Sequence, residues 1–127
     1  MSIAAQIRAA VAFTGYPCRQ VSYDGPDETY FTFNMFTTPS DYGDDAAGAE
    51  IYDVQLHLFA PFTLDTTVLR RQIKNALENA GFTRPSMVDA SENTRVSDGT
   101  EQHLVFECEI AADLDEGDTP EEVQGDD

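Results

Sequence analysis

An acidic stretch of the chain contains Tyr42-Gly43-Asp44-Asp45, the same tetrapeptide that RNA-dependent polymerases carry at their metal-binding hairpin. Metal chemistry of that kind needs a third carboxylate on a neighbouring strand and a basic channel for the nucleotide. The chain offers no basic stripe for such a channel. Asp44 and Asp45 are also adjacent, so their side chains point apart in an extended loop. We therefore interpret the tetrapeptide as a solvated acidic turn and predict no bound metal.

Other reactive side chains are few and widely separated. Cys18 and Cys108 lie ninety residues apart, and His57 and His103 each stand alone in a strand pattern. A zinc site needs about four ligands, and the chain has no GxSxG nucleophile elbow. We expect one buried thiol in each of two strands, a solvated His57, no cofactor and no enzymatic activity. A hydrolase with paired carboxylates stays open, although the sequence nominates no pair.

Charge is the strongest compositional signal, because 24 acidic residues against 7 basic ones give a net charge of -17. Phosphate contacts need Lys and Arg, so a duplex-binding surface is not expected. Two interpretations remain: an inhibitor that mimics DNA, and adaptation to molar salt, where self-repulsion is screened. We favour the second because Lys74 is the only lysine. No run of residues is apolar and long enough to span a membrane, and a soluble intracellular protein is expected.

Hydrophobic periodicity predicts two helices and five strands. The first helix is expected at 2–14, with Ser2 as its cap and Gly15 at its end. The second helix is expected at 63–81, capped by Thr63 or Asp65. Strands are expected at 18–23, 29–38, 49–61, 82–89 and 103–113, with a loop or hairpin before the last. This order indicates an α+β fold, a largely antiparallel sheet of about five strands with two helices packed on one face. We predict one domain at 1–112 and an acidic C-terminal extension at 113–127.

Alternation within the strands divides inward from outward side chains. The expected inward residues are Tyr52, Val54, Leu56, Leu58, Leu104, Phe106, Cys108 and Ile110. The strand at 29–38 has Phe31, Phe33 and Met35 on one face and Tyr30, Asn34 and Phe36 on the other, which indicates a central strand or one whose outer face meets a partner. Asp53, Gln55, His57, Glu107 and Glu109 are expected to point outward. The second helix places Arg70, Arg71 and Lys74 opposite its apolar stripe, so this basic face is a candidate contact for acidic surface on a neighbour.

The order of features from 29 to 111 resembles the tail terminator (tail completion) proteins of tailed viruses. The matching pieces are the Tyr42-Gly43-Asp44-Asp45 turn, the strand "IYDVQLHLFAP", the helix "VLRRQIKNALENAGF" and the last strand, "HLVFECEI". The acidic extension and the charge excess depart from the family pattern and fit a virus of halophilic archaea.

The resemblance implies a structural protein of the virion tail or neck, assembled in the host cytoplasm. It implies a ring, of six copies, that terminates the tail tube and joins it to the head-side connector. Its implied partners are other copies of itself, the major tail tube protein and a connector or stopper protein, while viral DNA passes through without sequence-specific binding. Candidate lumen or interface acids are Asp41, Asp44, Asp45, Glu50, Glu92, Asp98 and Glu101, and those of the extension are Asp113, Asp115 and Glu116. A head-tail stopper or adaptor, and a DNA-mimic inhibitor of a host nucleic-acid enzyme, remain alternatives.

Overall fold

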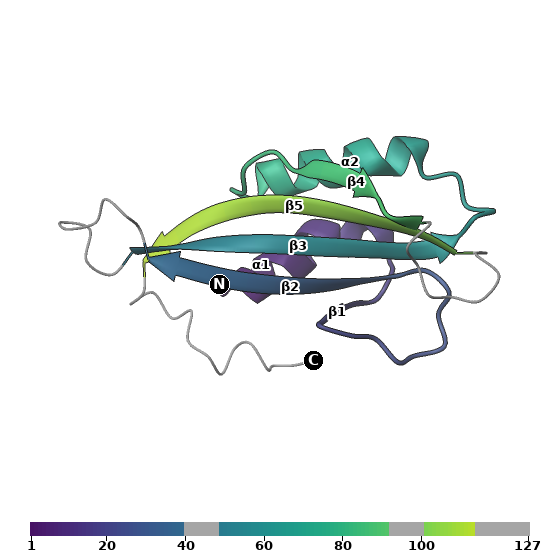
Figure 1. The fold of residues 1–127 in the computed structure, drawn as a ribbon, viewed down its shortest axis with the longest axis horizontal. Helices are drawn as coiled ribbons and strands as arrows, with labels where there is room; N and C mark the ends of the chain where they lie inside the picture. The colour runs from purple at the N-terminus through teal and green to yellow at the C-terminus, as the bar shows by residue number, and fades with distance from the viewer. Residues whose placement is uncertain (40–48, 92–100, 114–127) are drawn as a thin grey trace.

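The computed structural model describes residues 1–39, 49–91 and 101–113. Its elements are the helix α1 (Ile3–Val11), the 3-10 turn η1 (Ala12–Thr14), and the strands β1 (Cys18–Gln20), β2 (Tyr30–Pro39) and β3 (Ala49–Pro61). The helix α2 (Thr67–Asn79) and the strands β4 (Ser86–Asp89) and β5 (Glu101–Asp113) follow. The predicted α+β fold is confirmed, since the strands form one sheet in the order β1-β2-β3-β5-β4 and both helices cover one face of it (Figure 1).

The sheet is antiparallel except at one edge. The strands β2, β3 and β5 form its long centre, with Phe33 opposite Leu56 and Leu56 opposite Phe106. The short β1 is parallel to β2, and β4 adds the opposite edge by antiparallel pairing with β5. The register of these three strands therefore determines which of their side chains are neighbours on each face of the sheet.

The core lies between the sheet and the two helices. Its buried side chains are Ile3, Ile7, Val11, Phe31, Phe33, Tyr52, Val54, Leu56, Leu58, Ile73, Leu77, Phe82, Leu104 and Phe106, with Cys18 and Cys108. Met35 and Ile110 are half-buried against this cluster. The inward sets predicted for 49–61 and 103–113 are thus confirmed, as is the burial of both thiols, and in β2 the structure places the face of Phe31, Phe33 and Met35 inward.

Local chemistry explains where the elements begin and end. Ser2 caps α1, because its Oγ accepts a hydrogen bond from Ala5 N at 3.0 Å. Gly15 follows η1 with φ +78°, a conformation that glycine adopts without steric cost. The strand β1 ends at Gln20 rather than at the predicted residue 23, because Val21 has φ 76° and leaves the extended conformation.

The second helix starts four residues later than the predicted residue 63. Leu64 N donates to Pro61 O at 3.0 Å in a turn that delays the helix, and Asp65 Oδ1 then accepts from Thr67 N at 3.0 Å. Of the two predicted caps, Asp65 therefore binds the first turn and Thr63 does not. Among the described residues, no helix is both long and apolar enough to cross a membrane.

The central strands are longer than the helical layer. Thirteen residues of β3 extend about 43 Å, whereas thirteen residues of α2 rise about 20 Å. Figure 1 shows the end of β2, β3 and β5 that holds Pro39, Ala49 and Asp113 extending past both helices. The sheet face turned away from the helices is called the outer face below.

Candidate functional site

The predicted interface and lumen residues do not gather in one place. Arg70, Arg71 and Lys74 lie on α2. Glu50 and Glu101 lie near opposite ends of the β3–β5 pair, since Glu50 is opposite Ala112 and Glu101 is opposite Pro61. The backbone of Asp113 ends β5. The other candidates lie outside the described residues: Asp41, Asp44, Asp45, Glu92, Asp98, Asp115 and Glu116.

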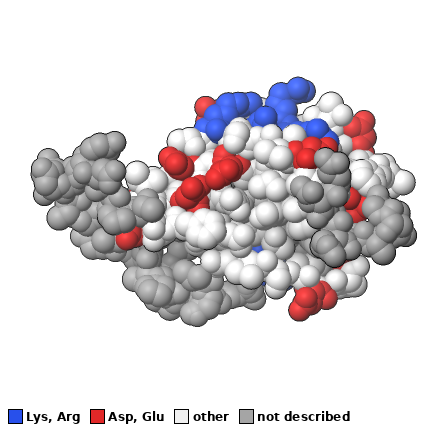
Figure 2. Space-filling view, in the orientation of Figure 1, with Lys and Arg blue, Asp and Glu red and all other residues white. Residues whose placement is uncertain are grey.

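The basic side chains of α2 differ in how firmly they are held. Arg70 Nε donates to Thr66 Oγ1 at 3.0 Å, and its guanidinium lies 3.9 Å from Asp89 Oδ2. Hydrogen bonds from Ser91 hold the pKa of Asp89 below its usual range. Arg71 is exposed and Lys74 is half-buried, and neither forms an ion pair within the part of the chain that the structure describes. Figure 2 shows the basic side chains gathered over α2.

A buried polar network holds the start of α2 against the sheet. Gln102 Nε2 donates to Pro61 O at 3.0 Å and to Leu64 O at 2.8 Å. Gln102 Oε1 accepts from Thr66 Oγ1 at 3.1 Å. Gln102 is 5% exposed and Thr66 is 3% exposed, so these bonds form away from water. The network fixes the turn before α2 and, through Thr66, the position of Arg70.

Three carboxylates meet on the outer face of the sheet. Asp53 is directly opposite Glu109, and the next outward residue of β5 is Glu107, opposite Gln55. We call Asp53, Glu107 and Glu109 the acidic sheet face. Burial raises the pKa of the Cys108 thiol to about 12, and the negative charges of these three carboxylates contribute in the same direction. The alternating sequence pattern predicts that these three side chains point outward. Their closeness to one another depends on the register between β3 and β5.

The acidic sheet face has no counter-charge in the described structure. None of its carboxylates forms an ion pair with a described basic side chain. Asp53 Oδ1 is buried and has no hydrogen-bond partner among the described residues. Phe36, directly opposite Asp53 on β2, is 55% exposed. This end of the outer face therefore presents an exposed ring beside three unpaired carboxylates.

The two histidines form a contact that the sequence analysis missed. His57 Nδ1 lies 2.8 Å from His103 Nε2, and the Phe59 ring stacks 4.3 Å from His103. Burial lowers the pKa of both histidines, and in His57 the charge of His103 adds to this effect. The expectation that His57 is a solvated, isolated side chain was wrong, because the β3–β5 register brings the two rings together and half-buries them.

The described residues contain no set of three His, Cys, Asp or Glu side chains placed to hold a metal ion. Both cysteines are free and buried, and burial raises the pKa of Cys18 to about 12. Neither thiol has the low pKa of a catalytic nucleophile. The tetrapeptide at 42–45 lies outside the described residues. What the described surface offers chemically is charge and apolar contact area.

Comparisons with known proteins show where this fold occurs. No protein-family model matches the sequence, and no curated protein matches it. A chain of the structure titled "Virion of native gene transfer agent (GTA) particle" is similar, with a TM-score of 0.52 and 13% sequence identity. The likeness covers 87% of this chain and 96% of that chain. At this identity the likeness shows a shared fold.

Proposed function

We propose that this chain is a structural protein of a phage-like virion particle. One observation carries the proposal: the fold of almost the whole chain is shared with nearly the full length of a chain from a gene transfer agent virion. The surface supports a structural role as well, because the described residues present charged and apolar contact area rather than an assembled reactive group. The DNA-mimic alternative gains no support from this likeness.

Within the particle, the chain forms a ring of six copies at the end of the tail tube. There it terminates the tail, contacts the major tail tube protein and joins the tube to the head-side connector. The resemblance of the sequence to tail terminator proteins supports this position. Acidic walls suit a passage for DNA, because like charge keeps the phosphate backbone from adhering. The acidic excess and the single lysine support a halophilic host.

Loss of the gene in the virus that encodes it tests this position. We expect tail tubes of uncontrolled length when particles that lack the protein are imaged by electron microscopy. Filled heads that leak DNA, beside tails of normal length, would instead assign the protein to the stopper or adaptor position. Normal particles would contradict both positions.

A further inference from the structure

The surface of α2 carries basic side chains that have no acidic partner among the described residues. Val68 is 55% exposed on this helix. Arg71, about one turn later, is also exposed, and Lys74, about one turn after Arg71, is half-buried. Neither cation forms an ion pair with a described residue. We call these three residues the basic helix face. The chain has 24 acidic residues and 7 basic ones, so a surface with two cations and an exposed apolar side chain differs from the overall charge of the protein.

The acidic sheet face carries carboxylates that have no basic partner among the described residues. Asp53 and Glu109 stand directly opposite each other, and like charges in that position destabilise a sheet. A buried carboxylate oxygen without a donor is also costly, and Asp53 Oδ1 is such an atom among the described residues. A cationic donor from outside the chain would relieve both costs.

The two faces match in size and in chemistry. From Val68 to Lys74 the helix rises about 9 Å. On the sheet, Phe36, Asp53 and Glu109 lie on three adjacent strands, which span about 10 Å. Each face therefore combines one exposed apolar side chain with charges of a single sign over a similar length.

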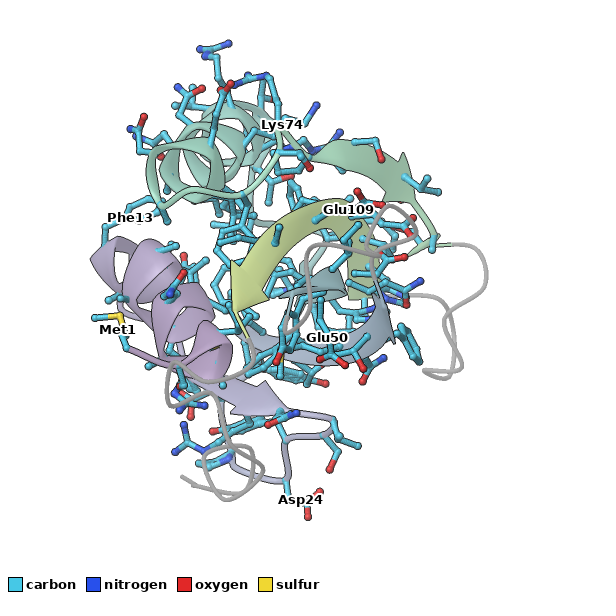
Figure 3. All side chains as sticks on the ribbon, turned by 90° about the vertical axis from the view of Figure 1, so that its left-hand side faces the viewer. Met1, Phe13, Asp24, Glu50, Lys74 and Glu109 are labelled. Carbon is cyan, nitrogen blue, oxygen red and sulfur yellow. The ribbon has the colours of Figure 1, made fainter. Side chains whose placement is uncertain are left out.

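The two faces lie on different elements. In Figure 3, Lys74 lies on the side of α2 next to β4, and Glu109 lies on the side of the sheet away from α1. A two-fold dimer through either face would set like charges against each other, which opposes association. A head-to-tail contact, in which the basic helix face of one copy meets the acidic sheet face of the next, pairs opposite charges, and contacts of this type close rings.

We propose that the basic helix face of one copy docks on the acidic sheet face of the next copy, with Arg71 and Lys74 facing Asp53, Glu107 and Glu109. This interface rests on the proposed ring and names the residues that build it. Val68 and Phe36 supply its apolar contact.

Charge reversal on one face at a time tests the interface in the purified full-length chain. The helix variant carries Arg71→Glu and Lys74→Glu, and the sheet variant carries Glu107→Lys and Glu109→Lys. All four positions lie at the surface of their elements. The matched control carries Asp24→Lys and Glu28→Lys, which are exposed in the connection between β1 and β2; Figure 3 shows Asp24 far from Lys74 and Glu109. Oligomer mass is measured by mass photometry, and thermal unfolding verifies that each variant folds.

We expect the wild type and the control to form the same ring. Each single-face variant alone should lose it, with an apparent dissociation constant raised roughly tenfold or more. A 1:1 mixture of the two variants should restore rings, because every contact then pairs opposite charges, and such rings must contain an even number of copies. A chain that carries all four reversals should also assemble.

Three results would overturn the proposal. Rings that survive both single-face reversals would remove this interface and leave the proposed ring intact. A second result would be that deletion of 114–127 abolishes rings while the sheet variant still assembles. The acidic extension would then be the segment that occupies the basic helix face. A wild type and a mixture that both stay monomeric, in molar salt as well, would count against the ring itself.

Discussion

His57 Nδ1 and His103 Nε2 lie 2.8 Å apart across the two longest strands of the sheet. A hydrogen bond between two imidazoles needs one ring nitrogen to donate and the other to accept, so at least one ring must be neutral. Burial lowers the pKa of each ring below its ordinary value of 6.5. The contact is therefore complete only while the pair is not fully protonated.

Acidification should weaken the fold through this pair. A histidine whose pKa is lowered by folding binds more protons when unfolded, so its contribution to stability is present above pH 6.5 and is lost as pH falls through the folded pKa. We expect the free energy of unfolding of the wild type to fall more steeply between about pH 7.5 and 5 than that of His57→Gln. Urea unfolding at several pH values measures both. A difference between the two proteins that does not change with pH would contradict the assignment.

Replacing Gln102 by leucine should destabilise the fold strongly. The change leaves Pro61 O and Leu64 O without the donor that Gln102 Nε2 now supplies in a buried site. We expect a loss of about 2–4 kcal/mol in the free energy of unfolding. The matched control is Gln72→Leu on the exposed side of α2, where a change within about 0.5 kcal/mol is expected. Equal losses in the two variants would show that the network does not contribute.

Ser2→Ala should remove the cap of α1. Ala5 N would lose the Ser2 Oγ acceptor that now lies 3.0 Å away, and the expected cost is about 1 kcal/mol. Thermal or urea unfolding measures the loss, and Ser22→Ala at an exposed position serves as the comparison. A loss no greater than that of Ser22→Ala would mean that the first turn does not depend on this bond.

The two thiols should be inert in the folded chain. Burial raises the pKa of Cys18 and of Cys108 to about 12, so almost no thiolate forms near neutral pH. We expect a thiol reagent such as DTNB to label neither cysteine in native buffer and to label both in urea. Rapid labelling of one cysteine under native conditions would show that its strand opens readily.

Sequence patterns predicted the element order and the faces of the strands because both depend on local periodicity. Leu56 and Phe106 were expected to point inward, and both are fully buried. Periodicity assigns a face but not a partner, so the pairing of His57 with His103 and of Asp53 with Glu109 became visible only with the strand register.

The sequence patterns also did not predict the tertiary hydrogen bonds of Gln102 or the backbone conformation of Val21. Gln102 was expected in a loop or hairpin, yet it lies in β5 and binds the turn before α2. The early end of β1 depends on the positive φ of Val21, a conformation that a β-branched residue rarely adopts. The bonds of Gln102 join segments that are distant in the sequence, and neither propensity nor alternation records such contacts or a positive φ at a single residue.

The overhang of the three central strands predicts a gradient of backbone protection. Near Phe31 and Leu58 the sheet is backed by helices, and amide protons there should exchange with deuterium only on global unfolding. At the far end, where β2 ends and β3 begins, the strands extend past both helices (Figure 1). Exchange should therefore be faster at that end, and a neighbour bound there would slow it, which makes deuterium uptake a direct gauge of contact at this tip.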